Sequence, residues 1–170
     1  MDKYQEALTQ WASFNVSTKE DRDLRFEKFK ALFAYNSGKL ENDEITWANT
    51  QEIFETGRVL NFSGDLKALI ETRNQKMCFE ILRNAIALKV PISLNLIKEV
   101  HYFLTNGTYD ERLYIQTNER PGEFKTFCYN EAEGSNPDSV EADLLDLLEE
   151  LSECEGKDAL RFFRKFTEAK

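Results

Sequence analysis

The sequence predicts an all-α fold: a single helical domain of about six or seven helices with one small β-hairpin or flap. Apolar residues recur every three or four positions through nearly the whole chain, which is the pattern of amphipathic helices. Capping residues stand before several of these stretches, and Gly or Pro stands after them. The length of 170 residues suits one domain, and 41% apolar residues with thirteen Phe suffice for a core.

The N-terminal part is expected to hold three helices, at residues 3–14, 19–36 and 47–57. Thr18 and Thr46 stand where N-cap residues belong, because a hydroxyl there accepts a hydrogen bond from an unpaired N–H of the first turn. Gly57 follows the third helix and is expected to end it. Between the second and third helices, a loop is expected along the stretch "SGKLENDE".

The remainder is expected to add three helices and a final amphipathic segment, at residues 66–88, 94–105, 138–153 and 157–170. Asp65 and Ser93 are the expected N-caps of the first two, and Pro91 separates them. Residues 109–132 differ from this pattern, because they combine β-rich pieces with one Pro-Gly turn. They indicate a hairpin or an extended loop.

Composition and charge exclude several classes of protein. A net charge of −9 argues against nucleic acid and against an anionic membrane surface as partners. No apolar run approaches the length of a bilayer span, and the N-terminus lacks the apolar stretch of a signal peptide. Three widely spaced cysteines, Cys78, Cys128 and Cys154, fit a reducing cytoplasm and offer neither a disulfide framework nor zinc spacing.

The residues alone do not predict an active site. His101 is the only histidine and lies inside an expected helix, so we expect it to be packed or hydrogen-bonded between helices. A catalytic histidine would need a nucleophile within reach and a third group to orient it. Gly-rich phosphate loops are absent from the sequence, and most carboxylates fall on the solvated face of the helix at 138–153.

Several segments together resemble the Fic (Fido) family, whose active members transfer AMP to hydroxyl side chains of target proteins. The resemblance runs from about Asp21 to Lys170. The segment "FAYNSGKLENDEITWANTQEIFETG" is similar to the family's inhibitory segment, in which Ser or Thr is followed after three residues by Glu and then by Gly or Asn. In this chain the resemblance implies Ser37, Glu41 and Asn42 as the inhibitory motif.

A second segment, "LIKEVHYFLTNGTYDERLYIQTNERPGEFKTFCY", resembles the helix and flap of the same family. The flap holds the target backbone beside the active site. The resemblance implies a target-docking flap formed by Gly122, Phe124, Lys125, Thr126 and Phe127. It also divides the chain into N-terminal helices with the inhibitory segment, residues 1–60, and a partial Fic core, residues 61–170.

The family's catalytic signature is not found in these residues. That signature is His-Pro-Phe, two residues, Gly-Asn-Gly-Arg, two residues, Arg, and it would follow the helix that "GKDALRFFRKF" resembles. No catalytic residue can therefore be assigned here, and no metal ligand. A complete member would use ATP and Mg²⁺, and its inhibitory Glu would pair with the second Arg of the signature; this chain is expected to need no cofactor.

Three hypotheses follow from these observations. The chain is the N-terminal part of an auto-inhibited Fic adenylyltransferase, inactive by itself; or a non-catalytic Fic-like module that lends Glu41 to another protein; or an acidic helical interaction domain. Expected partners are a protein target or a complete Fic protein. We also expect self-association, because the last segment exposes apolar side chains, namely Leu160, Phe162, Phe163 and Phe166.

Overall fold

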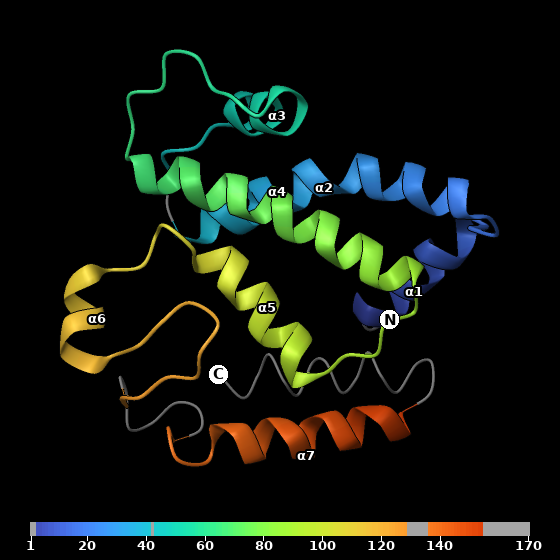
Figure 1. Cartoon of the computed structure of the whole chain (residues 1–170). Coiled ribbons are helices and arrows are strands. Elements are labelled where there is room, and N and C mark those ends of the chain that lie inside the picture. Colours follow the sequence, from blue (N-terminus) through green and yellow to red (C-terminus); the bar gives the residue numbers. More distant parts are fainter. Residues whose placement is uncertain (1–2, 42, 129–135, 155–170) are drawn as a thin grey trace.

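The fold is all-α, as predicted. The computed structural model describes residues 3–41, 43–128 and 136–154, and within them the chain forms seven helices and no strand (Figure 1). The helices are α1 (Lys3–Ser13), α2 (Lys19–Glu41), α3 (Trp47–Thr56), α4 (Leu66–Ala87), α5 (Leu94–Thr105), α6 (Glu111–Thr117) and α7 (Val140–Glu153). The predicted segment at 157–170, with Leu160, Phe162, Phe163 and Phe166, lies outside the described residues.

The predicted N-caps of three helices are confirmed. The side chain of Thr46 accepts a hydrogen bond from the backbone N–H of Asn49, whose own side chain accepts from the N–H of Thr46, which forms a capping box. Asp65 caps α4, and Ser93 caps α5. Gly57 ends α3 in the left-handed conformation at φ 76°, which glycine adopts without the steric cost of a Cβ.

The loop predicted at "SGKLENDE" is wrong for its first five residues. Helix α2 continues through Ser37 and Gly38 and ends at Glu41. A single glycine disfavours an α-helix by only about 1 kcal/mol, and no proline stands nearby to break the ladder of hydrogen bonds. The inhibitory motif therefore begins inside a helix rather than in a loop.

Residues 109–132 were predicted to form a hairpin or an extended loop, and in the described part, 109–128, a helix and a loop are found instead of a hairpin. The first part is the short helix α6, whose N-cap Asp110 accepts from the N–H of Arg112 and whose C-cap Asn118 is left-handed at φ 58°. Residues 118–128 then form an irregular loop without a strand, and 129–132 lie outside the described residues. The β propensity of Tyr114 and Ile115 was overridden by the capping residues at both ends of α6.

The last described helix starts later than predicted. Pro137 precedes a turn, and α7 begins at Val140 rather than Asp138. Neither α5 nor α7 holds a fully buried side chain, although both have an apolar face. No described helix is long and apolar enough to cross a membrane.

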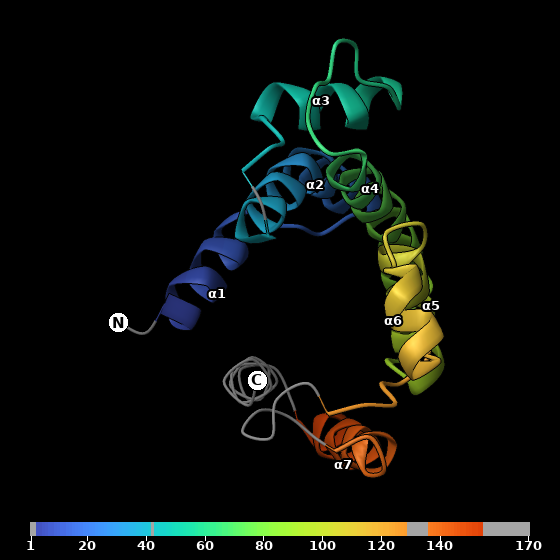
Figure 2. The same ribbon diagram turned by 90° about the vertical axis from the view of Figure 1, so that its left-hand side faces the viewer.

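Helix α4 packs against α2, α3 and α5 and joins them into one body. A small core of Ala34, Ile53 and Phe54 lies where α2, α3 and α4 meet. The ammonium group of Lys76 on α4 donates to the carbonyl oxygens of Ile53 and Phe54, at 3.0 and 2.7 Å, and so satisfies the C-terminal end of α3. In Figure 2 the helices follow an arc from α2 through α4 and α5 to α7.

Cys78 is the buried thiol of this body, and its reactivity is a direct test of the packing. Its side chain is 4% exposed, and burial raises the pKa of the Cys78 thiol to about 11. Because the thiolate is the reactive species, iodoacetamide at pH 8 should label Cys78 at least about tenfold more slowly than Cys128 and Cys154. Peptide mass spectrometry over a time course measures this. In urea the three rates should become equal, and equal rates in native buffer would contradict the described packing.

Candidate functional site

The predicted inhibitory motif lies at the C-terminal end of α2. Ser37 is half-buried, Glu41 is the last residue of the helix, and Asn42 lies outside the described residues. Near this end of the helix, Tyr35 packs edge-to-face on Trp47 of α3, with 5.5 Å between the ring centroids, and Ile45 in the following loop is buried. The C-terminus of a helix carries partial negative charge, so a glutamate is disfavoured there by about 0.3–1 kcal/mol unless a cation compensates it.

The predicted flap residues lie in the irregular loop 118–128, which we call the flap segment. Its anchor is Gly122, whose backbone N–H donates to Nδ1 of His101 on α5 at 3.0 Å. Gly122 is buried and adopts φ 79°. A Cβ at this position would stand 2.9 Å from Cβ of Tyr102 and 3.1 Å from the carbonyl oxygen of Lys98. Only glycine therefore allows the flap segment to approach α5 this closely.

A buried carboxylate, which the sequence did not single out, holds the flap segment together. Glu119 is 6% exposed; it accepts from the hydroxyl of Tyr109 at 3.1 Å and from the backbone N–H of Thr126 at 2.9 Å. The hydroxyl of Thr126 also donates to the carbonyl oxygen of Thr117. Glu119 thus ties the start of the flap segment to its end and to the residues before α6.

Among the other flap residues, some contact α5 and others are exposed to solvent or line a cavity. Lys98 of α5 pairs with Glu123 at 3.1 Å and lies over the ring of Phe124, with Nζ 4.5 Å from the ring centroid. Lys125 lines a cavity, and Phe127 is 57% exposed. The structure therefore brings the predicted flap residues together on one side of α5, while the inhibitory motif lies on a different helix.

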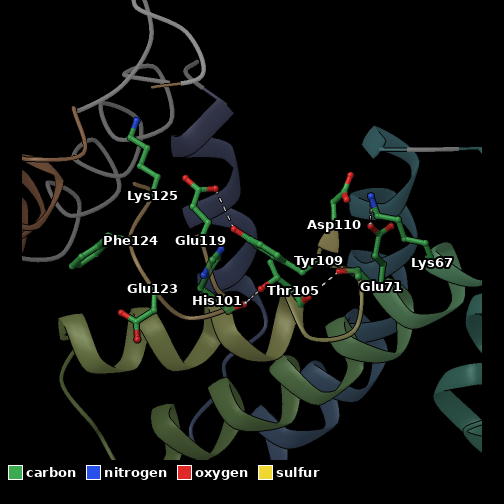
Figure 3. A pocket seen from close by; sticks show the side chains of 11 residues that line it. Lys67, Glu71, His101, Thr105, Tyr109, Asp110, Glu119, Glu123, Phe124 and Lys125 are labelled. Carbon is green, nitrogen blue, oxygen red and sulfur yellow. Dashed lines mark hydrogen bonds and ion pairs between the residues drawn. The ribbon is translucent and has the colours of Figure 1, made fainter. Parts of the chain in front are cut away.

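A cavity of about 470 Å³ lies between the flap segment, α5 and the N-terminal turns of α4 (Figure 3). Lys67 and Glu71 lie on one side of it and Phe124 and Lys125 on the other, with Glu119 between them. Side chains of both charge signs line it, so it suits a polar side chain of a peptide better than an apolar ligand.

In the described lining of this cavity, the histidine and one hydroxyl are engaged with backbone groups. The Nδ1 atom of His101 is occupied by the N–H of Gly122, and the nearby hydroxyl of Thr105 donates to the carbonyl oxygen of His101 at 2.8 Å. Nδ1 of His101 and the hydroxyl of Thr105 are thus engaged with backbone groups and not with each other. In the described ranges, no group of three His, Cys, Asp or Glu side chains is placed to hold a metal ion.

The contact between His101 and Gly122 requires a neutral imidazole, because Nδ1 must accept. We predicted a histidine packed or hydrogen-bonded between helices, and in the structure its partner is the flap segment. Desolvation lowers the pKa of His101, and the charge of Glu119 opposes this in part. A proton on Nδ1 would also remove the acceptor that Gly122 uses.

The lowered pKa of His101 predicts a loss of stability in mild acid. Below the ordinary pKa of 6.5 the unfolded chain binds a proton that the folded chain excludes. The free energy of unfolding should therefore be retained well above pH 6.5 and fall as the pH drops below 6.5 toward the lower pKa of the folded protein. Urea melts of the wild type and of His101→Gln check it, because glutamine can accept the same bond without titrating. An equally steep fall in both proteins would contradict the assignment.

Comparison with protein-family models, with curated proteins and with solved structures gave no match for this chain. The similarity to the Fic family stays a prediction, which depends on the sequence segments quoted above.

Proposed function

We propose that this chain supplies the inhibitory segment and the target-docking flap of a Fic-type protein adenylyltransferase, and that it transfers no AMP by itself. The observation that carries the proposal is the docking of the flap segment on α5. Gly122 and Glu119 fix its backbone at two points. Glu123, Phe124 and Lys125 line the cavity of Figure 3 together with side chains of α5. A loop held this firmly can present its backbone to an extended target peptide at little entropic cost.

The position of Glu41 supports the inhibitory part of the proposal. Positions 37 and 41 are four residues apart on one helix, so they fall on the same face. The partial negative charge of a helix C-terminus disfavours a carboxylate there and favours a nearby positive charge. An arginine from the catalytic signature would provide it, in the bidentate geometry that guanidinium and carboxylate groups share.

A non-catalytic regulatory module is the second candidate, and one observation favours it. Helices α1 and α2 expose large aromatic side chains, among them Trp11, Phe29 and Phe33. Exposed apolar surface of this kind is typical of protein-interaction sites. For both candidates we propose a cytoplasmic location, where the three free thiols would stay reduced.

The proposal predicts no AMP transfer by this chain. The general base and the phosphate-binding turn of the signature are not present in its sequence, so neither the target hydroxyl nor the nucleotide is activated. Incubation with labelled ATP, Mg²⁺ and a cell extract should leave the label unbound, while a complete Fic adenylyltransferase serves as the positive control. Label transfer that rises with the concentration of this chain would refute the proposal.

A further inference from the structure

A groove of about 570 Å³ with apolar walls lies between α1 and α2. The walls are formed mainly by five large side chains, namely Trp11, Phe14, Phe26, Phe29 and Leu32. Three of these side chains remain exposed, Trp11 by 47%, Phe29 by 49% and Leu32 by 47%. Apolar surface gathered in a concave site is typical of a place where a partner docks. We call this site the α1–α2 groove.

The spacing of the groove residues on α2 indicates the shape of the partner. Arg25, Phe29 and Leu32 stand at positions i, i+4 and i+7, so they form one row along the helix. With a rise of 1.5 Å per residue, this row is about 10 Å long, which is two helical turns. An amphipathic helix presents apolar side chains at the same spacing, and a helix lying in an apolar groove is a recurring mode of peptide recognition.

The charged side chains that line the α1–α2 groove are both basic, Arg25 and Lys28. The guanidinium group of Arg25 lies over the ring of Phe14, 4.1 Å from its centroid. Among the described residues, neither cation has a carboxylate within ion-pair distance, whereas Lys30 of the same helix pairs with Glu27. Because the whole chain has a net charge of −9, the groove is a basic site on an acidic protein, and it complements an acidic partner.

We infer that the α1–α2 groove binds an amphipathic helix of another protein, and that the polar flanks of this helix are acidic. Its apolar side chains cover Trp11, Phe29 and Leu32, and its carboxylates pair with Arg25 and Lys28. A second copy of this chain fits less well, because a twofold symmetric contact through the groove brings the same two cations of both copies together. The inference does not depend on the adenylyltransferase proposal, which concerns the flap segment and the end of α2.

Two synthetic peptides that differ only in charge test the inference. Each has about 18 residues, enough to form a helix, with Leu at positions i, i+3, i+4 and i+7. One peptide carries Glu on its polar face, and the other carries Lys there. Fluorescence anisotropy measures the binding of each labelled peptide at about 1 to 200 µM protein. We expect the acidic peptide to bind at least about tenfold more tightly, although the net charge of −9 would favour the basic peptide at an average place on the surface.

Substitutions in the groove separate the effect of its charge from that of its apolar walls. Arg25→Glu with Lys28→Glu should weaken binding of the acidic peptide at least about tenfold and strengthen binding of the basic one. Trp11→Ala should weaken binding of the acidic peptide without reversing the preference, because it removes apolar wall and no charge. The matched control, Arg58→Glu with Arg112→Glu, makes the same change of net charge on exposed residues elsewhere and should bind like wild type. A cooperative thermal melt first shows that each variant is folded.

Four results would overturn the inference. The first is an acidic peptide that does not bind over the whole concentration range, and the second is equal affinity for the two peptides. The third is a control variant that loses as much affinity as the groove variant, since net charge alone would then explain the binding. The fourth is a wild type that dimerises in sedimentation velocity through a contact that Arg25→Glu with Lys28→Glu removes, because the groove would then bind a second copy.

Discussion

Replacing Gly122 with valine should detach the flap segment from α5. The residue adopts φ 79°, where a β-branched side chain is strained, and the new Cβ would collide with Tyr102 and with the carbonyl oxygen of Lys98 at 2.9 and 3.1 Å. The two effects together disfavour the docked loop by roughly 2–3 kcal/mol, which raises the open population about 30- to 150-fold. Loss of the His101 contact follows, since that bond depends on the backbone N–H of Gly122.

Limited proteolysis measures the change. Trypsin should cleave the bond after Lys125 at a rate that rises with the open population, by at least about tenfold in Gly122→Val. Gly38→Val is the matched control, because no atom lies within 4 Å of a Cβ at Gly38 and its φ is not positive. Equal cleavage after Lys125 in wild type and Gly122→Val would show that the flap segment is not held by this close approach.

Replacing Glu41 with glycine should release inhibition in a protein in which this chain is followed by the Fic signature. The carboxylate would otherwise occupy the second arginine of the signature and exclude the γ-phosphate of ATP. A charge-assisted pair of this kind contributes about 1.5–3 kcal/mol, so transfer or nucleotide affinity should rise roughly ten- to a hundredfold. In the present chain alone, the same substitution should change little beyond the end of α2.

The comparison is a pair of transfer assays on that extended protein, after a cooperative thermal melt has shown that each variant is folded. Asp43→Gly is the control, because it removes a carboxylate two residues later whose contact with Lys39, at 3.8 Å, is exposed. Ser37→Ala should release inhibition less than Glu41→Gly, since a neutral hydroxyl only helps to position the helix end. Equal rates for wild type and Glu41→Gly would show that "SGKLEN" is an ordinary helix end.

The parts of the fold that the sequence predicted are those that local chemistry determines. Thr46, Asp65 and Ser93 cap their helices through hydrogen bonds that span two or three residues, so their roles can be recognised from sequence. The end of α2 was misplaced because the helix-breaking tendency of Gly38 is weak compared with helix propagation around it. Helix α6 was missed because β-prone residues stand between two strong caps.

Only those parts of the candidate site that depend on local sequence could be predicted. Gly122 was singled out by the resemblance, and a Pro-Gly turn is visible in the sequence. Glu119 was not, because its role depends on Tyr109 and Thr126, which only the folded loop brings to its carboxylate. A glutamate between two polar residues resembles any solvated side chain, and its burial cannot be read from periodicity.

The central place of α4 has a consequence for how cooperatively the chain unfolds. Helix α5 reaches α2 and α3 mainly through α4, whereas α2 and α3 also contact each other directly, and α1 and α7 lie toward the ends of the arc. An architecture in which elements touch only near neighbours behaves like a one-dimensional array, in which terminal elements can melt while the middle persists. A partner that engages α7 therefore acts on a terminal element and can order it without rearranging the helices around α4.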